Sequence, residues 1–445
     1  MDRDDLKRYS AVEVVLLAIF ALGLGLSLIV VRVRGHVEPG EPVALPGSGL
    51  AAAIPKGDKW QSAGGWHYET DNAYVLLGQM HVAGRPEMRV RWRYALCEDA
   101  GDPEQVLQTL ADTAGGKLVL LGMAEGPVPL VFGRIYVPAQ GGQDFLMGVA
   151  SLDFGRRLEL QISYRSDGWF AENVFRTLAA NIRYERPAAL QAGAERVHTF
   201  FEDIETTAGG LFIPNAARQL HYLVKDVADR PLGFVEQRFF AHNDPLGKGY
   251  YRITMRQLEQ GGLYSESDLW LDAEEDAFTW TTRSRLSRSR QPRVVEVRAD
   301  AQRRIVLTSK TEPEGSFRRT EMMLPEPLLP VFAAGLADAG DQIFVVDVLT
   351  GSGNVVPTQL AVIDANQSHV RASDPVWVVR ADYLHTQGAF DELVFDRQGQ
   401  CLGRFEQQPQ RPVRLWEQAD TEALQRIFGE RYEGFSQGDF QEARS

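Results

Sequence analysis

YYRITMRQLEQGGLYSESDLWLDAEEDAFTWTTRSR, residues 250–285, holds three consecutive strand-like runs and is the clearest sign of this chain's fold. The runs are Tyr250–Leu258, Tyr264–Leu271 and Phe278–Arg285, and each is rich in the aromatic and β-branched residues that suit a pleated sheet. Only short links that carry glycine or acidic residues separate them, and short links favour antiparallel neighbours. The stretch therefore predicts an antiparallel meander.

Runs of the same kind continue on both sides, so an antiparallel β module is expected at residues 211–416. A short apolar helix, Pro327–Ala339, is predicted to interrupt it. So many successive strands predict a curved or barrel-like sheet. The further strands expected are Leu220–Val227, Gly233–Ala241, Val294–Arg298, Ile305–Lys310, Phe317–Met323, Ile343–Leu349, Pro357–Ile363, Val376–Ala381, Leu393–Phe395 and Cys401–Phe405.

Two segments of this module share one pattern, LV-x-D, five residues, LG, two residues, EQ. They begin at Leu223 and at Leu393. Each is predicted to be a hairpin whose turn lies between the Asp and the Gly. The echo has two explanations, an ancient duplication or two hairpins with similar turn chemistry, and the sequence leaves both open.

A smaller module is expected before it, at residues 54–186. In Met88–Leu96 apolar residues alternate with arginine, so one face of this strand is buried and the other faces water. Helices are expected at Pro103–Ala114 and near Trp169–Ile182. Strands and helices in this order predict an α+β sandwich, and the fold class of the chain is therefore expected to be α+β. The strands expected between the helices are Leu118–Leu121, Leu130–Pro138, Phe145–Phe154 and Leu158–Arg165.

This order of elements, with the opening IPKGDKW at residues 54–60 and the closing FRTL at 175–178, resembles the PsbP/Mog1-like fold. The resemblance implies a binding or accessory module and transfers no functional residue. The second module is similar only in architecture to half-barrel carriers of the bacterial lipoprotein-sorting type. In that comparison residues 328–336 would be the apolar helix that the sheet wraps, and the resemblance implies a greasy cavity beside it.

AVEVVLLAIFALGLGLSLIVV, residues 11–31, is apolar except for Glu13 and long enough to cross a bilayer as one helix. Arg32 and Arg34 follow directly, where a cleavable signal peptide would carry small residues, so an uncleaved signal anchor is expected. The sequence thus predicts a single-pass membrane protein with the bulk of the chain on the extracytoplasmic, periplasmic side. The predicted organisation is a tail (1–10), a transmembrane anchor (11–31), a Pro/Gly linker (32–53), the first module (54–186), a connector (187–210), the β module (211–416), and a C-terminal helix and tail (417–445).

Charge and composition narrow the class of partner. The formal net charge of −13 argues against a general nucleic-acid binder. With 44% hydrophobic and 24% charged residues, the chain can build a sizeable core. Arginine strongly outnumbers lysine, which suggests a bacterial source. Cys97 and Cys401 have no spacing partner for a metal or redox motif, and could either pair or be buried thiols.

No familiar catalytic motif is present in the sequence. Residues 351–354, GSGN, lead into a strand-like run rather than a helix, so they do not form a phosphate-binding loop. The eight histidines form no close ligand pair. We therefore predict no enzyme activity, no catalytic residue, no metal site and no cofactor.

The strongest local anomaly is an arginine-rich stretch at the end of the quoted segment. Guanidinium groups suit phosphate or carboxylate, so an anionic partner or a lipid head group is expected to bind here. The alternative is a solvated sheet edge that charge protects from pairing with other edges. The candidate residues are Arg283, Arg285, Arg288, Arg290 and Arg293.

These observations predict a membrane-anchored accessory or scaffold subunit that binds another protein in an envelope complex. Two alternatives stay open, a lipid- or ligand-binding carrier domain tethered to the membrane, and a hydrolase whose site is assembled only in space. A spacious apolar cavity in the second module would favour the carrier, whereas a filled core with an exposed apolar patch would favour the scaffold.

Overall fold

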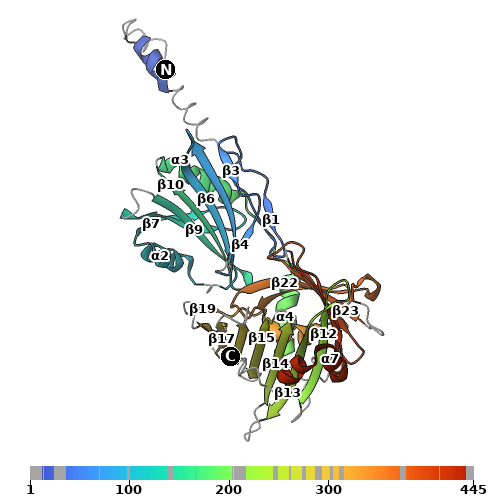
Figure 1. Ribbon diagram of the computed structural model, residues 1–445. Helices are drawn as coiled ribbons and strands as arrows, with labels where there is room; N and C mark the ends of the chain where they lie inside the picture. Colours follow the sequence, from blue (N-terminus) through green and yellow to red (C-terminus); the bar gives the residue numbers. More distant parts are fainter. Residues whose placement is uncertain are drawn as a thin grey trace.

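The computed structural model of the protein is built mainly of β-strands, which form three sheets (Figure 1). It describes residues 13, 15–24, 37–69, 71–97, 101–138, 144–165, 167–202, 204, 217–243, 249–259, 262–272, 277–285, 293–300, 304–309, 315–370, 377–409 and 411–436.

The first module contains an eight-stranded sheet in the order β3-β5-β6-β10-β9-β8-β7, with β4 paired to β5. Helix α3 (Gly168–Ala180) covers one face, where Phe175 stacks on Phe132 of β8. Helix α2 (Pro103–Thr113) covers part of the other face through Leu107 and Ala111. The predicted helices and strands of this module are confirmed. The strands are β3 (Trp60–Ser62), β4 (His67–Glu69), β5 (Ala73–Val82), β6 (Arg85–Ala95), β7 (Lys117–Ala124), β8 (Leu130–Tyr136), β9 (Asp144–Leu152) and β10 (Arg156–Tyr164).

A small sheet of three strands lies beside it, in the order β1 (Val43–Leu45), β2 (Leu50–Ala52) and β11 (Arg183–Tyr184). Residues 43–52 belong to the predicted linker, so part of that linker is ordered as strand. The predicted strand content of the region was therefore too low. Leu45 and Leu50 are buried there, and their burial explains why proline and glycine do not keep this segment irregular.

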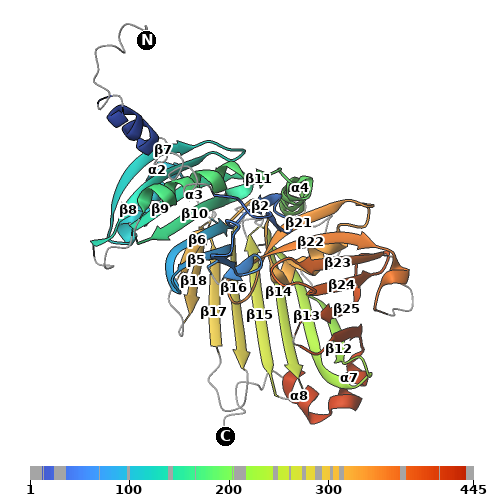
Figure 2. The same cartoon turned by 90° about the horizontal axis from the view of Figure 1, so that it is seen from above.

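The second module is one sheet of fifteen strands. The chain runs outward from the middle through β12 to β19, crosses to the far edge at β20, and returns to the middle at β26, which pairs with β12. Neighbours are antiparallel except for β20 and β21. Figure 2 shows the sheet curving along this path. The strands are β12 (Ala217–Lys225), β13 (Pro231–Asn243), β14 (Gly249–Glu259), β15 (Tyr264–Asp272), β16 (Ala277–Arg285), β17 (Arg293–Ala299), β18 (Arg304–Ser309), β19 (Gly315–Arg318), β20 (Met323–Pro325), β21 (Ile343–Leu349), β22 (Val355–Ile363), β23 (Trp377–Tyr383), β24 (Phe390–Phe395), β25 (Cys401–Gln407) and β26 (Arg414–Gln418).

Helices fill much of the space that the curved sheet surrounds. Helix α4 (Ala188–Glu202), where only a connector with a helical turn was expected, packs against β21 so closely that a Cβ on Gly193 would lie 1.9 Å from the Val345 carbonyl oxygen. Its Phe200 meets Phe332 of α6 (Leu329–Ala334) edge to face. A short 3-10 turn, η4 (Glu326–Leu328), leads into α6, so the predicted apolar helix is shorter than expected.

Two C-terminal helices pack on the opposite, convex face of the sheet. They are α7 (Thr421–Phe428), as predicted, and α8 (Glu430–Ser436). Phe234 of β13 is their anchor, because its ring meets those of Phe428 and Phe435 at centroid distances of 5.0 and 4.6 Å.

A buried ion pair joins the two modules. Both terminal nitrogens of Arg156 in β10 donate to Asp347 in β21, at 2.8 and 2.7 Å, and both side chains are almost fully buried. Close by, the Val355 N–H donates to Asn72 and the Tyr68 hydroxyl donates to the Val355 carbonyl. One hydrophobic cluster runs through both modules without a break. The modules therefore share a core.

The repeated hairpin pattern is confirmed as two matching turns. Asp226 and Asp396 each accept hydrogen bonds from the backbone N–H groups two and four residues later. Both hairpins have a register shift at the same point, after Val224 and after Val394. The residue two positions before the returning strand has positive φ in both turns, +60° at Asp229 and +76° at Gly399.

Two predictions of fold and location are wrong. The fold class is mainly β rather than α+β, because most described residues belong to sheets and the helices only cover or fill them. Within the described parts of the chain, no helix combines the length and the apolar character needed to cross a membrane. That finding covers residues 13 and 15–24 of the predicted anchor 11–31, and the other residues of the anchor lie outside the described set. This finding contradicts the transmembrane anchor and the single-pass membrane location.

Candidate functional site

The structure separates the predicted arginines instead of gathering them into one strip. Arg283 and Arg285 lie on β16, directly opposite Glu266 and Tyr264 of β15. Side chains alternate along a strand, so both arginines face away from the core that holds Trp280 of the same strand. Arg283 is more than half exposed, and its Nη1 lies 4.0 Å from Glu266 Oε2.

Arg293 faces the other way. It begins β17 opposite Ser284, and the alternating residues Val295 and Val297 of the same strand are buried in the core. Arg288 and Arg290 lie outside the described residues. Of the three arginines that the structure describes, Arg293 is therefore the one whose side chain the strand alternation places on the concave side, although Arg283 also borders a pocket on that side.

Arg293 lines a pocket of about 260 Å³ on that concave side. Residues from six strands, β13 to β17 and β25, meet there with η4, the start of α6 and the turn after β21. Met255, Trp280, Val295, Pro327 and Pro330 make its apolar walls. The polar or charged lining residues are Gln237, Ser265, Glu266, Ser267, Thr282, Arg283, Ser284, Arg293, Glu326, Ser352 and Arg404.

Arg404, on β25, is the charged centre of the pocket floor. Its Nη2 donates to Asp391 Oδ2 at 2.6 Å, and its Nε lies 3.1 Å from Glu406 Oε1. The Tyr383 hydroxyl also donates to Asp391, whose side chain is 1% exposed. The guanidinium carbon of Arg404 lies 5.0 Å from the centre of the Trp416 ring. A deeply placed positive charge is thus fixed by a carboxylate, a second carboxyl and an aromatic face.

The carboxyl groups around Arg404 have shifted pKa values. Burial raises the pKa of Glu326 and of Glu406 above the usual value, although the charge of Arg404 opposes the shift. Burial likewise raises the pKa of Tyr383. These carboxyl groups therefore bind a proton more readily than exposed ones do. Carboxyl and phenol groups of this kind can hydrogen-bond to the oxygen atoms of a ligand.

The charged cluster around Arg404 was not predicted from the sequence, although the repeated hairpin pattern includes this residue. The repeated hairpin pattern covers Arg404, but it compares turn chemistry and does not show which face of β25 the arginine occupies. Asp391, Glu326 and Arg293 come from distant segments, which the curved path of the large sheet brings together.

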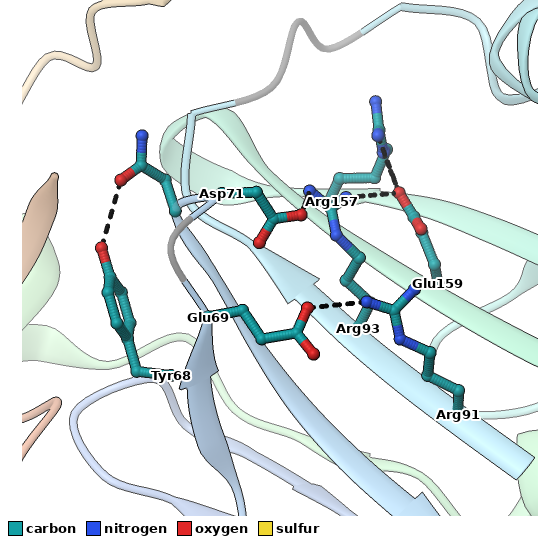
Figure 3. Close-up of polar contacts among 8 residues, drawn as sticks. Tyr68, Glu69, Asp71, Arg91, Arg93, Arg157 and Glu159 are labelled. Carbon is teal, nitrogen blue, oxygen red and sulfur yellow. Dashed lines mark hydrogen bonds and ion pairs between the residues drawn. The ribbon is translucent and has the colours of Figure 1, made fainter. Parts of the chain in front are cut away.

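A second charged cluster lies on the open face of the first sheet (Figure 3). Arg91 contacts Glu69 at 2.7 Å, and Arg93 contacts Asp71 at 3.0 Å and Glu159 at 2.9 Å. Arg157 reaches the same Glu159 at 2.7 Å. Each guanidinium in this cluster already faces a carboxylate, so the cluster acts as a set of cross-strand ties rather than as a bare positive patch.

The other notable surface is the edge strand β7, which ends the eight-stranded sheet. Val119, Leu120, Leu121 and Met123 are exposed by 41%, 44%, 37% and 59%. Strand β8 is its only ladder partner among the residues that the structure describes. The apolar run of β7 predicted a strand, but the sequence could not show that the strand would lie at an edge.

The described residues hold no group of three or more side chains that could bind a metal ion. Cys97 is buried and Cys401 is partly buried, and neither forms a disulfide. Burial raises the pKa of the Cys401 thiol to about 11, which makes it a poor nucleophile.

Comparison with known proteins adds a weak likeness of fold. No protein-family model matches the chain, and no curated protein is significantly similar in sequence. A beta-barrel-like protein of a domain of unknown function, DUF1849, from Brucella abortus is 12% identical, with a TM-score of 0.34 over 47% of this chain and 98% of that one. Cyanobacterial PsbP from Synechocystis sp. PCC 6803 is 13% identical, with a TM-score of 0.26 over 33% of this chain and 92% of that one. Both TM-scores lie below 0.5, so neither likeness supports a conclusion about fold or function.

Proposed function

We propose that this protein is an accessory or scaffold protein that binds another polypeptide, and that the partner adds a strand to the edge strand β7. The carrying observation is the row of four large apolar side chains exposed along this edge. An edge strand offers backbone N–H and C=O groups to an incoming strand, and native proteins usually protect such edges with charge. In β7 only Lys117, at the very start, is charged.

The interior of the second module supports a scaffold more than a lipid carrier. Leu329, Val331 and Phe332 of α6 are buried at 2% exposure or less, so most of this helix belongs to the core, and Pro330 at its start borders the pocket. The pocket of about 260 Å³ is smaller than the 300–1,000 Å³ typical of sites for drug-sized ligands, although most of its surface is apolar. The buried pair of Arg156 and Asp347 holds the two modules together, which suits a rigid platform.

Site-specific photo-crosslinking in the source cells tests the proposal. A photoreactive residue at Val119 is expected to capture a discrete polypeptide, and mass spectrometry should place the adduct in an extended segment of that partner. The matched control is Val227, which is 72% exposed but lies in a hairpin turn. It should capture no such adduct.

A second variant tests whether strand addition is the mode of binding. Leu120→Lys combined with Met123→Lys places two charges on the edge and should abolish the adduct from position 119, while thermal unfolding stays nearly unchanged because both side chains are already exposed. An adduct of equal yield from positions 119 and 227, or one that persists in the lysine variant, would contradict the proposal.

A further inference from the structure

A groove of about 630 Å³ lies on the open face of the first sheet, the face that α2 covers only in part. Five neighbouring strands form its floor, in the order β3-β5-β6-β10-β9. Neighbouring strands are about 4.8 Å apart, so this floor spans roughly 19 Å. Both dimensions suit an extended ligand rather than a single ion. The row of directly opposed residues that crosses the five strands is Gln61, Gln79, Arg89, Ser163 and Phe145.

Several polar side chains in this groove have no partner among the residues that the structure describes. Ser163 is only 7% exposed, yet its hydroxyl forms no hydrogen bond with any of them. The same holds for the side-chain amides of Gln79 and Gln161. A ligand in the groove would therefore meet donors and acceptors that no described protein group already occupies.

Arg89 supplies a positive charge that is available to a ligand. It is exposed on β6 and forms no ion pair with a described residue. The next arginine on the same face, Arg91, is held by Glu69 at 2.7 Å (Figure 3). Glu87 lies two residues from Arg89 but does not line the groove, and no described lining residue is acidic. One free guanidinium without a nearby lining carboxylate suits a carboxylate on the ligand.

The position of the groove on the face of the sheet narrows the class of ligand. Strands β5, β6 and β10 are paired on both sides, so their backbone groups are largely taken up by the ladders. A peptide that binds a sheet relies mainly on backbone groups at an edge, and it gains few of them here. Glutamine amides and serine hydroxyls donate and accept hydrogen bonds, as sugar hydroxyl groups do. Leu77 and Phe145 add apolar surface for the C–H groups of a sugar ring. The net charge of −13 disfavours a nucleic acid.

We propose that this groove binds an acidic oligosaccharide of the uronic acid type. A carboxylate of the sugar contacts Arg89, and sugar hydroxyl groups contact Gln79, Gln161 and Ser163. The inference is independent of the proposed partner at β7, because the groove uses the face of other strands whereas β7 offers its edge.

Isothermal titration calorimetry of the full-length protein tests the inference with defined tetrasaccharides. The probes are tetragalacturonate, tetramannuronate and tetraguluronate, and at least one of them is expected to bind saturably at one site. The methyl ester of the best uronate keeps the sugar hydroxyl groups but loses the charge, so it should bind at least tenfold more weakly. Tetraglutamate carries carboxylates without sugar hydroxyl groups and should not bind.

Matched variants locate the binding. Arg89→Met should weaken the best uronate tenfold or more, and Gln161→Leu should weaken both the uronate and its methyl ester. Arg176→Met is the control, because Arg176 lies on α3, on the opposite face of the same sheet, and pairs with Glu172. Both arginines are exposed, so their variants should fold. Absence of binding by all three uronates, equal binding of tetraglutamate, or unchanged affinity in Arg89→Met would overturn the inference.

Discussion

At the scale of single residues, the contact between Arg156 and Asp347 carries the most consequence for folding. Asp347 is fully buried and accepts hydrogen bonds from Arg156 and, at 2.8 Å, from Thr320. Arg156→Met would leave this carboxylate buried without its cation, which costs about 3–5 kcal/mol in comparable buried pairs. We expect the free energy of unfolding, measured with urea, to fall by that amount.

The double variant Arg156→Met with Asp347→Leu should recover most of the loss, since replacing both charges removes the stranded carboxylate. Arg176→Ala provides the control, because its pair with Glu172 is exposed to solvent and is worth about 0.5 kcal/mol or less. A loss below about 1 kcal/mol in Arg156→Met would show that the pair is not the tie between the modules.

The buried carboxyl group of Glu326 should make the unfolding free energy depend on pH. Burial raises the pKa of its carboxyl above the usual 4.5, so the folded protein binds this proton more tightly than the unfolded chain. The resulting stability is present below pH 4.5 and is lost as pH rises through the folded pKa. Glu326→Gln should therefore flatten the decline of the unfolding free energy above pH 4.5, as measured by urea unfolding across a pH series. Glu406 retains a slope of the same sign. Parallel profiles for the variant and the parent would refute this account.

At the scale of elements, the two repeated hairpins predict which substitutions a turn accepts. Gly399 and Asp229 hold the same turn position, with φ of +76° and +60°. Asp tolerates this left-handed region, whereas β-branched residues do not. Gly399→Asp should therefore change the unfolding free energy little, while Gly399→Val should lower it by about 1–2 kcal/mol more. Thermal and urea unfolding of the two variants would check the difference, and equal losses would contradict it.

Comparison of the observed helices and strands with the predicted ones shows which of them sequence patterns can predict. Alternation, capping and turn residues were sufficient for the hairpins at Asp226 and Asp396, for α2 and α7, and for most strands, because each of these depends on neighbours in sequence. The length of α4 was missed, since its helical residues are stabilised by packing on β21. The prediction of a membrane anchor at residues 11–31 rested on hydropathy alone. Arg404 and the open edge of β7 could not be found, because facing and edge position depend on the whole sheet.

At the scale of the whole molecule, the two modules that the sequence predicts share one hydrophobic core. Trp92 and Phe175 of the first module belong to the same buried cluster as Trp280, Phe332 and Trp416 of the second. Buried polar contacts between the modules add to it, among them the hydrogen bond of 2.8 Å from Val355 N–H to Asn72. Separate modules joined by a mobile linker would not bury these groups together.

We therefore expect the full-length protein to unfold in one cooperative transition, with equal calorimetric and van't Hoff enthalpies. Asn72→Ala together with Arg156→Met removes two of the polar ties and should split the transition, because each module keeps its own sheet but loses contacts with the other. Differential scanning calorimetry of the parent and the double variant measures this directly. Two resolved transitions in the parent would mean that the modules fold independently, and the buried pair would then only orient them.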